Sequence, residues 1–528
     1  MTLAGTGAAT WSQVGTTTNE LTTTVVVLFA VLLFVRGFAA NGEYVASYWR
    51  PILVGALLGL ATGLKLTAAV YAPAMGVVVL LAPRSVRLGL RDAILFGAAS
   101  AAVLLLSYGP WGWHLYQQTG NPFFPMFNGF FHSPWAAAAA GRDPRFFPKS
   151  LMQWLFYPFY WLDYNKFTVM DLNFRDARFA AFYIVSAITV GVVLFTTLRA
   201  QKPKSVALRP ISLVLAFTVM AYVIWLVMFS ILRYAVALEI LVSILTILLL
   251  FKLGDMLFGR SAYLSSIVIA ALLTVALLVY ARPPDWGHVA YGRSVFAINV
   301  PKLPSDALVI FANAPMGNLA PLFAARQQDM NFVGVPSCFG VGQWCNNLFF
   351  HYDLGRAMRA ALLAHAQDLY VAYYLNRMPS FPGLVAFGVA VDAANCRTIT
   401  SNVSSDIRLC HAHLTPAGQH SMVSYYRLAA EVSTQPGVQM HVVWVDNRCT
   451  TETGVGTANF KWDLARTVPG STDLYVRLPP GPQTLFAAGG QQGSAETGAW
   501  VQAGQEFTLR VHDGHELAIV RMRYTPCH

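Results

Sequence analysis

The chain has 528 residues, of which 55% are hydrophobic and only 12% are charged, and its mean hydropathy is +0.49. This composition excludes an ordinary soluble enzyme and indicates a protein with several membrane spans. The formal net charge of +11 lies wholly in residues 1–282, which hold 20 Lys and Arg against 9 Asp and Glu. The positive charge is therefore a signal of membrane topology, and no nucleic acid partner is expected.

Apolar runs predict eight membrane helices. The run Ile52–Ala82 contains 31 residues and a single charge, Lys65. It is too long for one crossing of about 20 residues, so we expect two short helices that meet near Lys65, packed closely through their Gly and Ala residues. The other predicted spans are Leu21–Ala39, Ala93–Tyr108, Phe179–Leu198, Ile211–Leu232, Tyr234–Leu250 and Tyr263–Ala281.

Basic residues define the orientation of these spans. They form three loop clusters, which are Arg84, Arg87 and Arg91; Arg199, Lys202, Lys204 and Arg209; and Lys252 and Arg260. All three clusters lie on one side if Ile52–Ala82 crosses twice, and the positive-inside rule assigns that side to the cytoplasm. We therefore expect a multi-pass protein of the bacterial inner membrane. Its N-terminus, the loop 109–178 and the region after residue 282 would be periplasmic.

All six cysteines lie in the region that is expected outside. They are Cys338, Cys345, Cys396, Cys410, Cys449 and Cys527. An even number in a soluble region indicates disulfides and an oxidising compartment, although free buried thiols are the alternative. Proximity along the chain favours pairing the first with the second, the third with the fourth and the fifth with the sixth.

The region after Arg282 changes from membrane spans to soluble elements. In residues 283–420, predicted strands and helices alternate, which indicates a small α/β domain. From residue 421 to the end, short strands separated by turns indicate a β-sandwich. The expected fold class is therefore a polytopic α-helical membrane domain of about eight helices in residues 1–282, followed by an extracytoplasmic α/β domain and a C-terminal β-sandwich.

Lys65 is the charge that most requires an explanation. An ammonium group within an apolar run costs about 2.5–3.5 kcal/mol on insertion scales. Either the side chain reaches the interface from a helix end, or it meets the phosphate of a lipid. Sequence reasoning leaves both interpretations open.

Several arginines present a similar choice. Arg233 and Tyr234 lie shortly before Glu239, on the outer side between two predicted spans. A buried acid near a basic pair usually forms an internal ion pair, but a guanidinium is also suited to bidentate phosphate contact. Arg175 and Arg178, in the aromatic loop 109–178, could contact ordinary lipid headgroups or bind a specific phosphate.

The order of several segments resembles the GT-C superfamily of polytopic glycosyltransferases. The segments are Val14–Glu20, Gly59–Lys65, Gly120–Pro125, Arg233-Tyr234 with Glu239, Ala495–Trp500 and Gly504–Phe507. The resemblance covers most of the chain. It implies that a sugar is transferred from a polyprenyl-phosphate donor, which lies in the membrane lipid, to a glycan or protein acceptor of the cell envelope.

The resemblance also implies roles for individual residues. Glu20 would be the catalytic acid–base residue, or would orient the acceptor or a divalent metal ion. Cations would stabilise the charge that grows on the departing phosphate. The residues expected to bind the lipid phosphate are Lys65, Arg175, Arg178, Arg233 and Tyr234.

One departure from the superfamily pattern keeps a second interpretation open. Members generally carry a catalytic acid in a loop after the first membrane helix, and no such helix and loop precede Leu21 in this sequence. The chain would then be a truncated, split or inactive member. It would be a non-catalytic membrane protein whose periplasmic domains bind glycan or scaffold the assembly of an envelope polymer. A transporter is less favoured, because no paired half-repeats with broken helices are evident.

Overall fold

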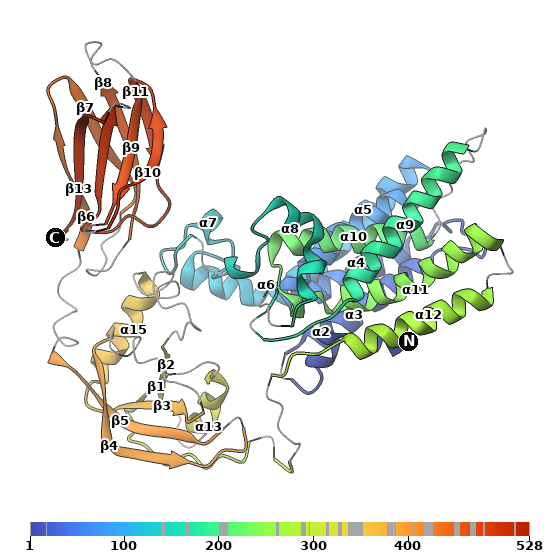
Figure 1. The fold of residues 1–528 in the computed structure, drawn as a ribbon. Coiled ribbons are helices and arrows are strands. Elements are labelled where there is room, and N and C mark those ends of the chain that lie inside the picture. The colour runs from blue at the N-terminus through green and yellow to red at the C-terminus, as the bar shows by residue number, and fades with distance from the viewer. Residues whose placement is uncertain are drawn as a thin grey trace. The chain divides into compact units, whose positions relative to one another are not determined.

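The chain folds into two compact units, one comprising Met1–Gln118 and Gly141–His288 and the other Thr119–Ala140 and Val289–His528. Figure 1 shows the helices of the first unit and the sheets of the second. The computed structural model describes residues 2–16, 18–138, 143–164, 168–170, 172–199, 210–259, 263–286, 292–294, 296–312, 316–325, 330–335, 352–376, 384, 387–403, 405–416, 426–447, 455–464, 471–478, 481–511 and 514–526.

The described part of the first unit is helical. Its helices are α1 (Thr2–Gly5), α2 (Ala8–Ser12), α3 (Glu20–Val35), α4 (Trp49–Leu64), η1 (Leu66–Val70), α5 (Tyr71–Leu81), α6 (Val86–Thr119), η2 (Pro144–Phe146), α8 (Leu151–Phe156), η3 (Tyr157–Trp161), α9 (Arg178–Arg199), α10 (Pro210–Met228), η4 (Leu232–Ala235), α11 (Val236–Phe258) and α12 (Tyr263–Tyr280).

Five helical segments among the described residues are long and apolar enough to cross a membrane: α6, α9, α10, η4 together with α11, and α12. They indicate a membrane protein, as the composition predicts. Three shorter apolar helices, Glu20–Val35, Trp49–Leu64 and Leu66–Leu81, occupy the positions of the other predicted spans. The helix is interrupted at Lys65, between α4 and η1, as the run Ile52–Ala82 predicts. The count of eight crossings stays a prediction.

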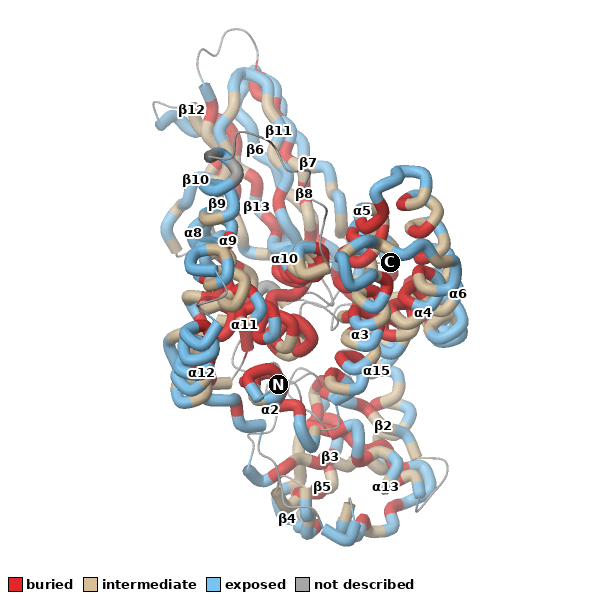
Figure 2. The backbone as a smooth tube through the Cα atoms, turned by 90° about the vertical axis from the view of Figure 1, so that its right-hand side faces the viewer, coloured by how far each residue is buried: buried red, intermediate tan, exposed pale blue. Residues whose placement is uncertain are grey.

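Burial separates an inner helix from outer helices in this unit. In an apolar stretch of 18 residues taken from each segment, 61% of the residues are buried for Leu232–Phe258, against 6% for α6 and 17% for α12, and Figure 2 shows α11 largely in red and α12 largely in blue. Both outer helices expose large apolar side chains, including Leu106, Leu272 and Val279. Such surfaces are stable where lipid covers them.

Helices α4 and α6 approach closely through three glycines spaced four residues apart. A Cβ atom at Gly55 would lie 2.2 Å from the carbonyl oxygen of Phe96, and one at Gly59 would lie 2.3 Å from that of Ser100. A Cβ atom at Gly63 would lie 1.9 Å from Oγ of Ser107. Small residues at this spacing let helix backbones come together in a membrane, and they position the end of α4, where Lys65 follows.

A five-stranded sheet forms the α/β part of the second unit. Its strands are β1 (Leu308–Phe311), β2 (Asn331–Gly334), β3 (Leu369–Tyr374), β4 (Val389–Ile399) and β5 (Ile407–Leu414), in the order β2-β1-β3-β5-β4. The first three strands are parallel, β5 pairs antiparallel with β3, and β4 pairs antiparallel with β5. Alternate residues of β1 enter two cores on opposite faces, one with α15 (Asp353–Ala364) and one with η6 (Gly317–Leu319) and α13 (Ala320–Ala324).

One predicted disulfide is confirmed. Cys396 and Cys410 are register partners on β4 and β5 and are bonded to each other. The other predicted pairs, Cys338–Cys345 and Cys449–Cys527, lie outside the described residues.

The C-terminal region is rich in β-strands, as predicted. Its strands are β6 (Tyr426–Thr434), β7 (Val438–Asp446), β8 (Thr457–Leu464), β9 (Thr472–Arg477), β10 (Thr484–Gly489), β11 (Gln492–Glu496), β12 (Glu506–Val511) and β13 (Glu516–Pro526). They form a five-stranded sheet, β10-β9-β12-β13-β6, and a three-stranded sheet, β11-β8-β7. The two sheets share one hydrophobic core, in which the rings of Phe460 and Phe507 lie 4.3 Å apart.

The predicted loop 109–178 is divided between the two units. Its first part continues α6 to Thr119, whereas residues 119–140, with the short helix α7 (Asn128–Phe131), belong to the second unit. The buried amide of Asn128 organises this segment, because its Nδ2 donates to the carbonyl oxygens of Ser133, Ala136 and Ala137. The peptide nitrogen of Asp353 donates to the carbonyl oxygen of Pro134 at 3.0 Å, which joins the segment to α15.

Candidate functional site

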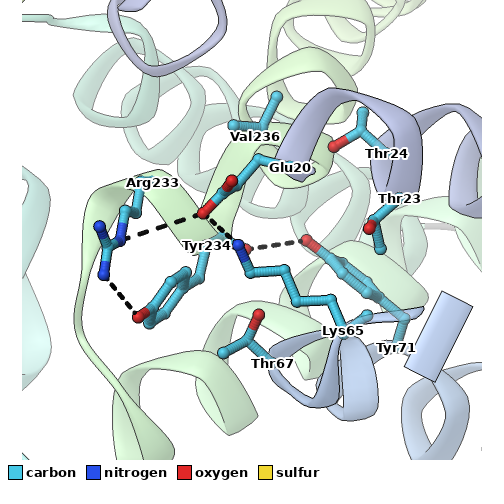
Figure 3. Close-up of a pocket in the computed structure, with 10 residues that line it drawn as sticks. Glu20, Thr23, Thr24, Lys65, Thr67, Tyr71, Arg233, Tyr234 and Val236 are labelled. Atoms are coloured by element: carbon cyan, nitrogen blue, oxygen red, sulfur yellow. Dashed lines mark hydrogen bonds and ion pairs between the residues drawn. The ribbon is translucent and has the colours of Figure 1, made fainter. Parts of the chain in front are cut away.

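An open pocket in the first unit gathers the charged residues that the sequence singles out. About 260 Å³ of empty space lies within it, including space that is open to solvent. It is lined by Glu20, Thr23, Thr24, Lys65, Thr67, Ala68, Tyr71, Arg233, Tyr234 and Val236. Figure 3 shows that these side chains come from three separate parts of the chain: the start of α3, the break between α4 and η1 with the start of α5, and η4 with the start of α11.

Glu20 is the first residue of α3, and its side chain is only 4% exposed. A carboxylate is favourable there because the N-terminus of a helix carries partial positive charge. The preceding residue, Asn19, donates from Nδ2 to the carbonyl oxygen of Leu64 at 3.0 Å. This bond joins the start of α3 to the end of α4 and brings Glu20 beside Lys65.

Lys65 occupies the break in the apolar run, with an extended backbone between α4 and η1. Its ammonium group forms an ion pair with Oε1 of Glu20, and the lysine side chain is 21% exposed. Two of the predicted site residues, 45 positions apart in the sequence, are therefore in direct contact.

Arg233 and Tyr234 reach the same pocket from η4. Nε of Arg233 lies 4.0 Å from Oε1 of Glu20, and its Nη2 donates to the hydroxyl of Tyr234 at 2.9 Å. The Tyr234 ring also faces both cations, with its centroid 5.5 Å from Nζ of Lys65 and 5.0 Å from Cζ of Arg233. Cations are attracted to the face of an aromatic ring at these distances.

The pocket carries an excess of positive charge. Its lining residues include two cations, Lys65 and Arg233, and one carboxylate, Glu20. The hydroxyl groups of Thr24 and Thr67 line the same space. Cations with nearby hydroxyl donors can bind a phosphate oxygen, so this arrangement can hold an anion with a small headgroup.

Two predicted phosphate ligands lie elsewhere in the first unit. Arg178 is 1% exposed, pairs with Asp176 and donates to the carbonyl oxygens of Leu3 and Thr6. These contacts enclose its guanidinium and give Arg178 a structural role outside the pocket lining, so its binding of a lipid phosphate stays an untested prediction. Arg175 lies outside the pocket lining, donates from Nε to the carbonyl oxygen of Tyr280 and stacks on that ring at 4.8 Å.

Glu239 also departs from the expected arrangement. It is 1% exposed, and its partners are at the N-terminus of α2 and not on Arg233. Its carboxylate accepts hydrogen bonds from the peptide nitrogens of Ala9 and Thr10, at 2.9 and 2.8 Å, and from Oγ1 of Thr10 at 2.7 Å. The expected ion pair with the basic residues is therefore replaced by capping of a short helix that is distant in the sequence.

Apart from Tyr234, sequence reasoning missed the neutral residues of the pocket. Thr67 and Tyr71 follow Lys65 by two and six positions in the same apolar run, and that spacing is the signal that could have identified them. Tyr71 donates from its hydroxyl to the carbonyl oxygen of Tyr234 at 3.3 Å, which ties α5 to η4. Thr23 and Thr24 lie three and four residues after Glu20 in α3.

A metal ligand set is not found in the described part of the chain, where no three His, Cys, Asp or Glu residues gather. Glu20 is the single carboxylate among the pocket-lining residues. A divalent metal ion therefore stays a prediction.

Comparison with known proteins identifies no relative. No family model matches this chain, and no match was found among curated proteins or among solved structures.

Proposed function

We propose that this protein is a GT-C-like membrane glycosyltransferase that moves a sugar from a polyprenyl-phosphate donor to an acceptor of the cell envelope. The observation that supports the proposal is the convergence of Lys65, Arg233 and Glu20 on one open pocket. A sugar phosphodiester carries one negative charge, which matches the single excess positive charge of the pocket lining.

The proposed reaction assigns a role to each charged group. An acceptor hydroxyl attacks the anomeric carbon of the sugar, and the bond between that carbon and the phosphate oxygen breaks. Glu20 takes the hydroxyl proton as general base. The leaving polyprenyl phosphate keeps the bonding electron pair and gains negative charge, which Lys65 and Arg233 stabilise.

The proposal also includes a location. It assigns the pocket and the region after residue 282 to the periplasmic side of a bacterial inner membrane. Alkaline phosphatase fused after Val300 is expected to be active, and the same reporter fused after Ser205 is expected to be inactive. The reverse pattern would invert the topology.

Binding of a lipid phosphate tests the proposed site. Calorimetry with the purified full chain in detergent would compare farnesyl phosphate, a short polyprenyl phosphate, with farnesol, which lacks the phosphate. Lys65→Ala is expected to weaken binding of farnesyl phosphate about tenfold or more, the effect of losing a charge-assisted contact of at least about 1.4 kcal/mol. Lys65→Arg should retain part of the affinity, because a planar guanidinium replaces a compact ammonium.

A matched control is Arg84→Ala. Arg84 is 76% exposed and forms an ion pair with Glu43, so its loss should leave binding unchanged. Equal binding by the wild type, Lys65→Ala and Arg84→Ala would contradict the proposal. It would favour a non-catalytic membrane protein whose outer domains bind glycan or scaffold envelope-polymer assembly.

A further inference from the structure

Glu20 lies where a bound phosphate would have to be. Its carboxylate contacts the ammonium of Lys65 directly and lies 4.0 Å from Nε of Arg233. An anion that uses both cations must therefore share them with Glu20 or replace it. Sharing brings a second negative group beside the Glu20 carboxylate, whose side chain is only 4% exposed, and like charges repel more strongly where little water screens them.

The carboxylate of Glu20 is held by charge alone. Among the described residues, neither of its oxygens has a hydrogen-bond partner apart from its ionic contacts. The carboxylate of Glu239 instead accepts three hydrogen bonds. Releasing Glu20 from Lys65 therefore breaks no network of neutral donors, and an incoming phosphate supplies the charge that Lys65 loses.

We propose that the phosphate of the lipid donor displaces Glu20 from Lys65, so that donor binding exchanges one anion for another on the same ammonium group. The inference rests on the proposed function, because it assumes that the anion is a lipid phosphate. Before the exchange, the ion pair stabilises the Glu20 carboxylate and weakens it as a base. After the exchange, the carboxylate is free to accept a proton, so donor binding precedes productive binding of the acceptor.

If the phosphate displaces Glu20, removing the Glu20 charge should tighten donor binding. If Glu20 only helped to bind the donor, its removal would weaken that binding. Glu20→Gln removes the competing anion, so the Kd for farnesyl phosphate should fall by at least about threefold, the effect of removing a partly exposed ion pair. Glu20→Asp keeps the charge but shortens the side chain by one methylene, which weakens its contact with Lys65. Its Kd should fall by a smaller factor.

The measurement is calorimetry of the purified full chain with farnesyl phosphate, inorganic phosphate and farnesol. Tighter binding of both phosphates by Glu20→Gln would show that the headgroup is the competing group, and tighter binding of farnesyl phosphate alone would identify a lipid phosphate. Glu43→Gln is the matched control, because Glu43 forms an exposed ion pair with Arg84. The Kd of this variant for farnesyl phosphate should equal that of the wild type. If Glu20→Gln does not elute as a folded protein, Glu20→Asp carries the test.

Two results would overturn the exchange. In the first, Glu20→Gln binds farnesyl phosphate no more tightly than the wild type, although Lys65→Ala still loses binding; the proposed function would then survive without the exchange. In the second, Glu20→Gln binds more tightly but Glu20→Asp does not, so net charge and not the Lys65 contact controls the affinity. Unchanged binding by Lys65→Ala would instead contradict the proposed function itself.

Discussion

Two buried glutamates in the first unit, Glu20 and Glu239, have opposite surroundings. Both lie in the first turn of a helix, and they are 4% and 1% exposed. Glu20 faces an open pocket and contacts the cations Lys65 and Arg233. Glu239 lies in a closed interior and accepts hydrogen bonds from α2.

The difference shows that burial alone does not identify a functional acid. A buried carboxylate that accepts its hydrogen bonds from donors of the fold stabilises the fold. A carboxylate balanced by cations beside an opening can exchange them for another partner. The variants below test this contrast, from the largest expected effect to the smallest.

Arg178→Ala should cause the largest loss of stability. Arg178 and Asp176 form a buried ion pair beside Glu239 and α2, and removing one partner of such a pair costs about 3–5 kcal/mol. Lys65→Ala should lose only about 1 kcal/mol, because Arg233 remains 4.0 Å from Glu20. Unfolding of the purified protein by titration with SDS measures the loss of stability in both variants. Equal losses in Arg178→Ala and Lys65→Ala would contradict the distinction between the closed network and the open pocket.

Gly59→Ala tests the packing that positions Lys65. The added methyl group would lie 2.3 Å from the backbone oxygen of Ser100 on α6, so α4 and α6 must separate, at about 1–3 kcal/mol. Binding of farnesyl phosphate should also weaken, because the end of α4 moves. Gly97→Ala on α6 is the control, since nothing lies within 4 Å of its added methyl group; the same loss in both variants would contradict the packing argument.

Gly7→Ala tests the closed network around Glu239. Its methyl group would lie 1.9 Å from Oε2 of Glu239, and that carboxylate cannot move without losing hydrogen bonds to α2. We expect a loss of about 1–2 kcal/mol with unchanged affinity for farnesyl phosphate in the folded protein. At Gly5, nothing lies within 4 Å of an added methyl group, so Gly5→Ala should leave the stability unchanged. A large drop in affinity for Gly7→Ala would mean that the network and the pocket are coupled.

The smallest expected effect is the contribution of Glu506, in the second unit, to stability as the pH changes. Burial by itself raises the pKa of Glu506, but hydrogen bonds and charges from Arg477 and Arg521 outweigh burial and hold the pKa below its ordinary value of 4.5. A lowered pKa in the folded state contributes stability above pH 4.5, and this contribution is lost as the pH falls through the folded pKa. Both arginines are more than a third exposed, so the contribution should stay below about 1 kcal/mol.

Hydrogen exchange of β12 and β13 in the full chain, compared between pH 6 and pH 3, measures this contribution. Glu506→Gln should lose protection at pH 6 and show a smaller change with pH than the wild type. Glu431→Gln is the control, because Glu431 pairs with Arg523 at 3.4 Å and both side chains are largely exposed. An unaltered pH dependence in Glu506→Gln would contradict the assignment.

The membrane helices could be predicted from the sequence because hydropathy is a local property of each segment. The run Phe179–Leu198 became α9, and Tyr263–Ala281 became α12, within one residue at each end. The span predicted as Ala93–Tyr108 was too short, since α6 continues through Pro110 to Thr119. No strand was predicted at β4, because β4 is only partly buried and lacks regular alternation.

The candidate site could be predicted only in part. Charges within apolar runs are costly wherever they occur, which is why sequence reasoning selected Glu20, Lys65 and Arg233, and the structure brings these three together. The same reasoning selected Arg178 with equal weight. Nothing local distinguishes it, because the carbonyl oxygens that enclose it belong to α1 and the residue after it, more than 170 positions away.

By itself, the sequence determined which segments are apolar enough to enter a membrane and which charges need a partner, because the free energy of inserting a side chain depends on its own segment. Tertiary structure alone decided which partner each charge has. Glu20 and Glu239 both lie in the first turn of a helix, yet one contacts Lys65 and the other contacts α2. Ion pairs and hydrogen bonds act over only a few ångströms, and such distances are set by the packing of elements that are remote in the sequence.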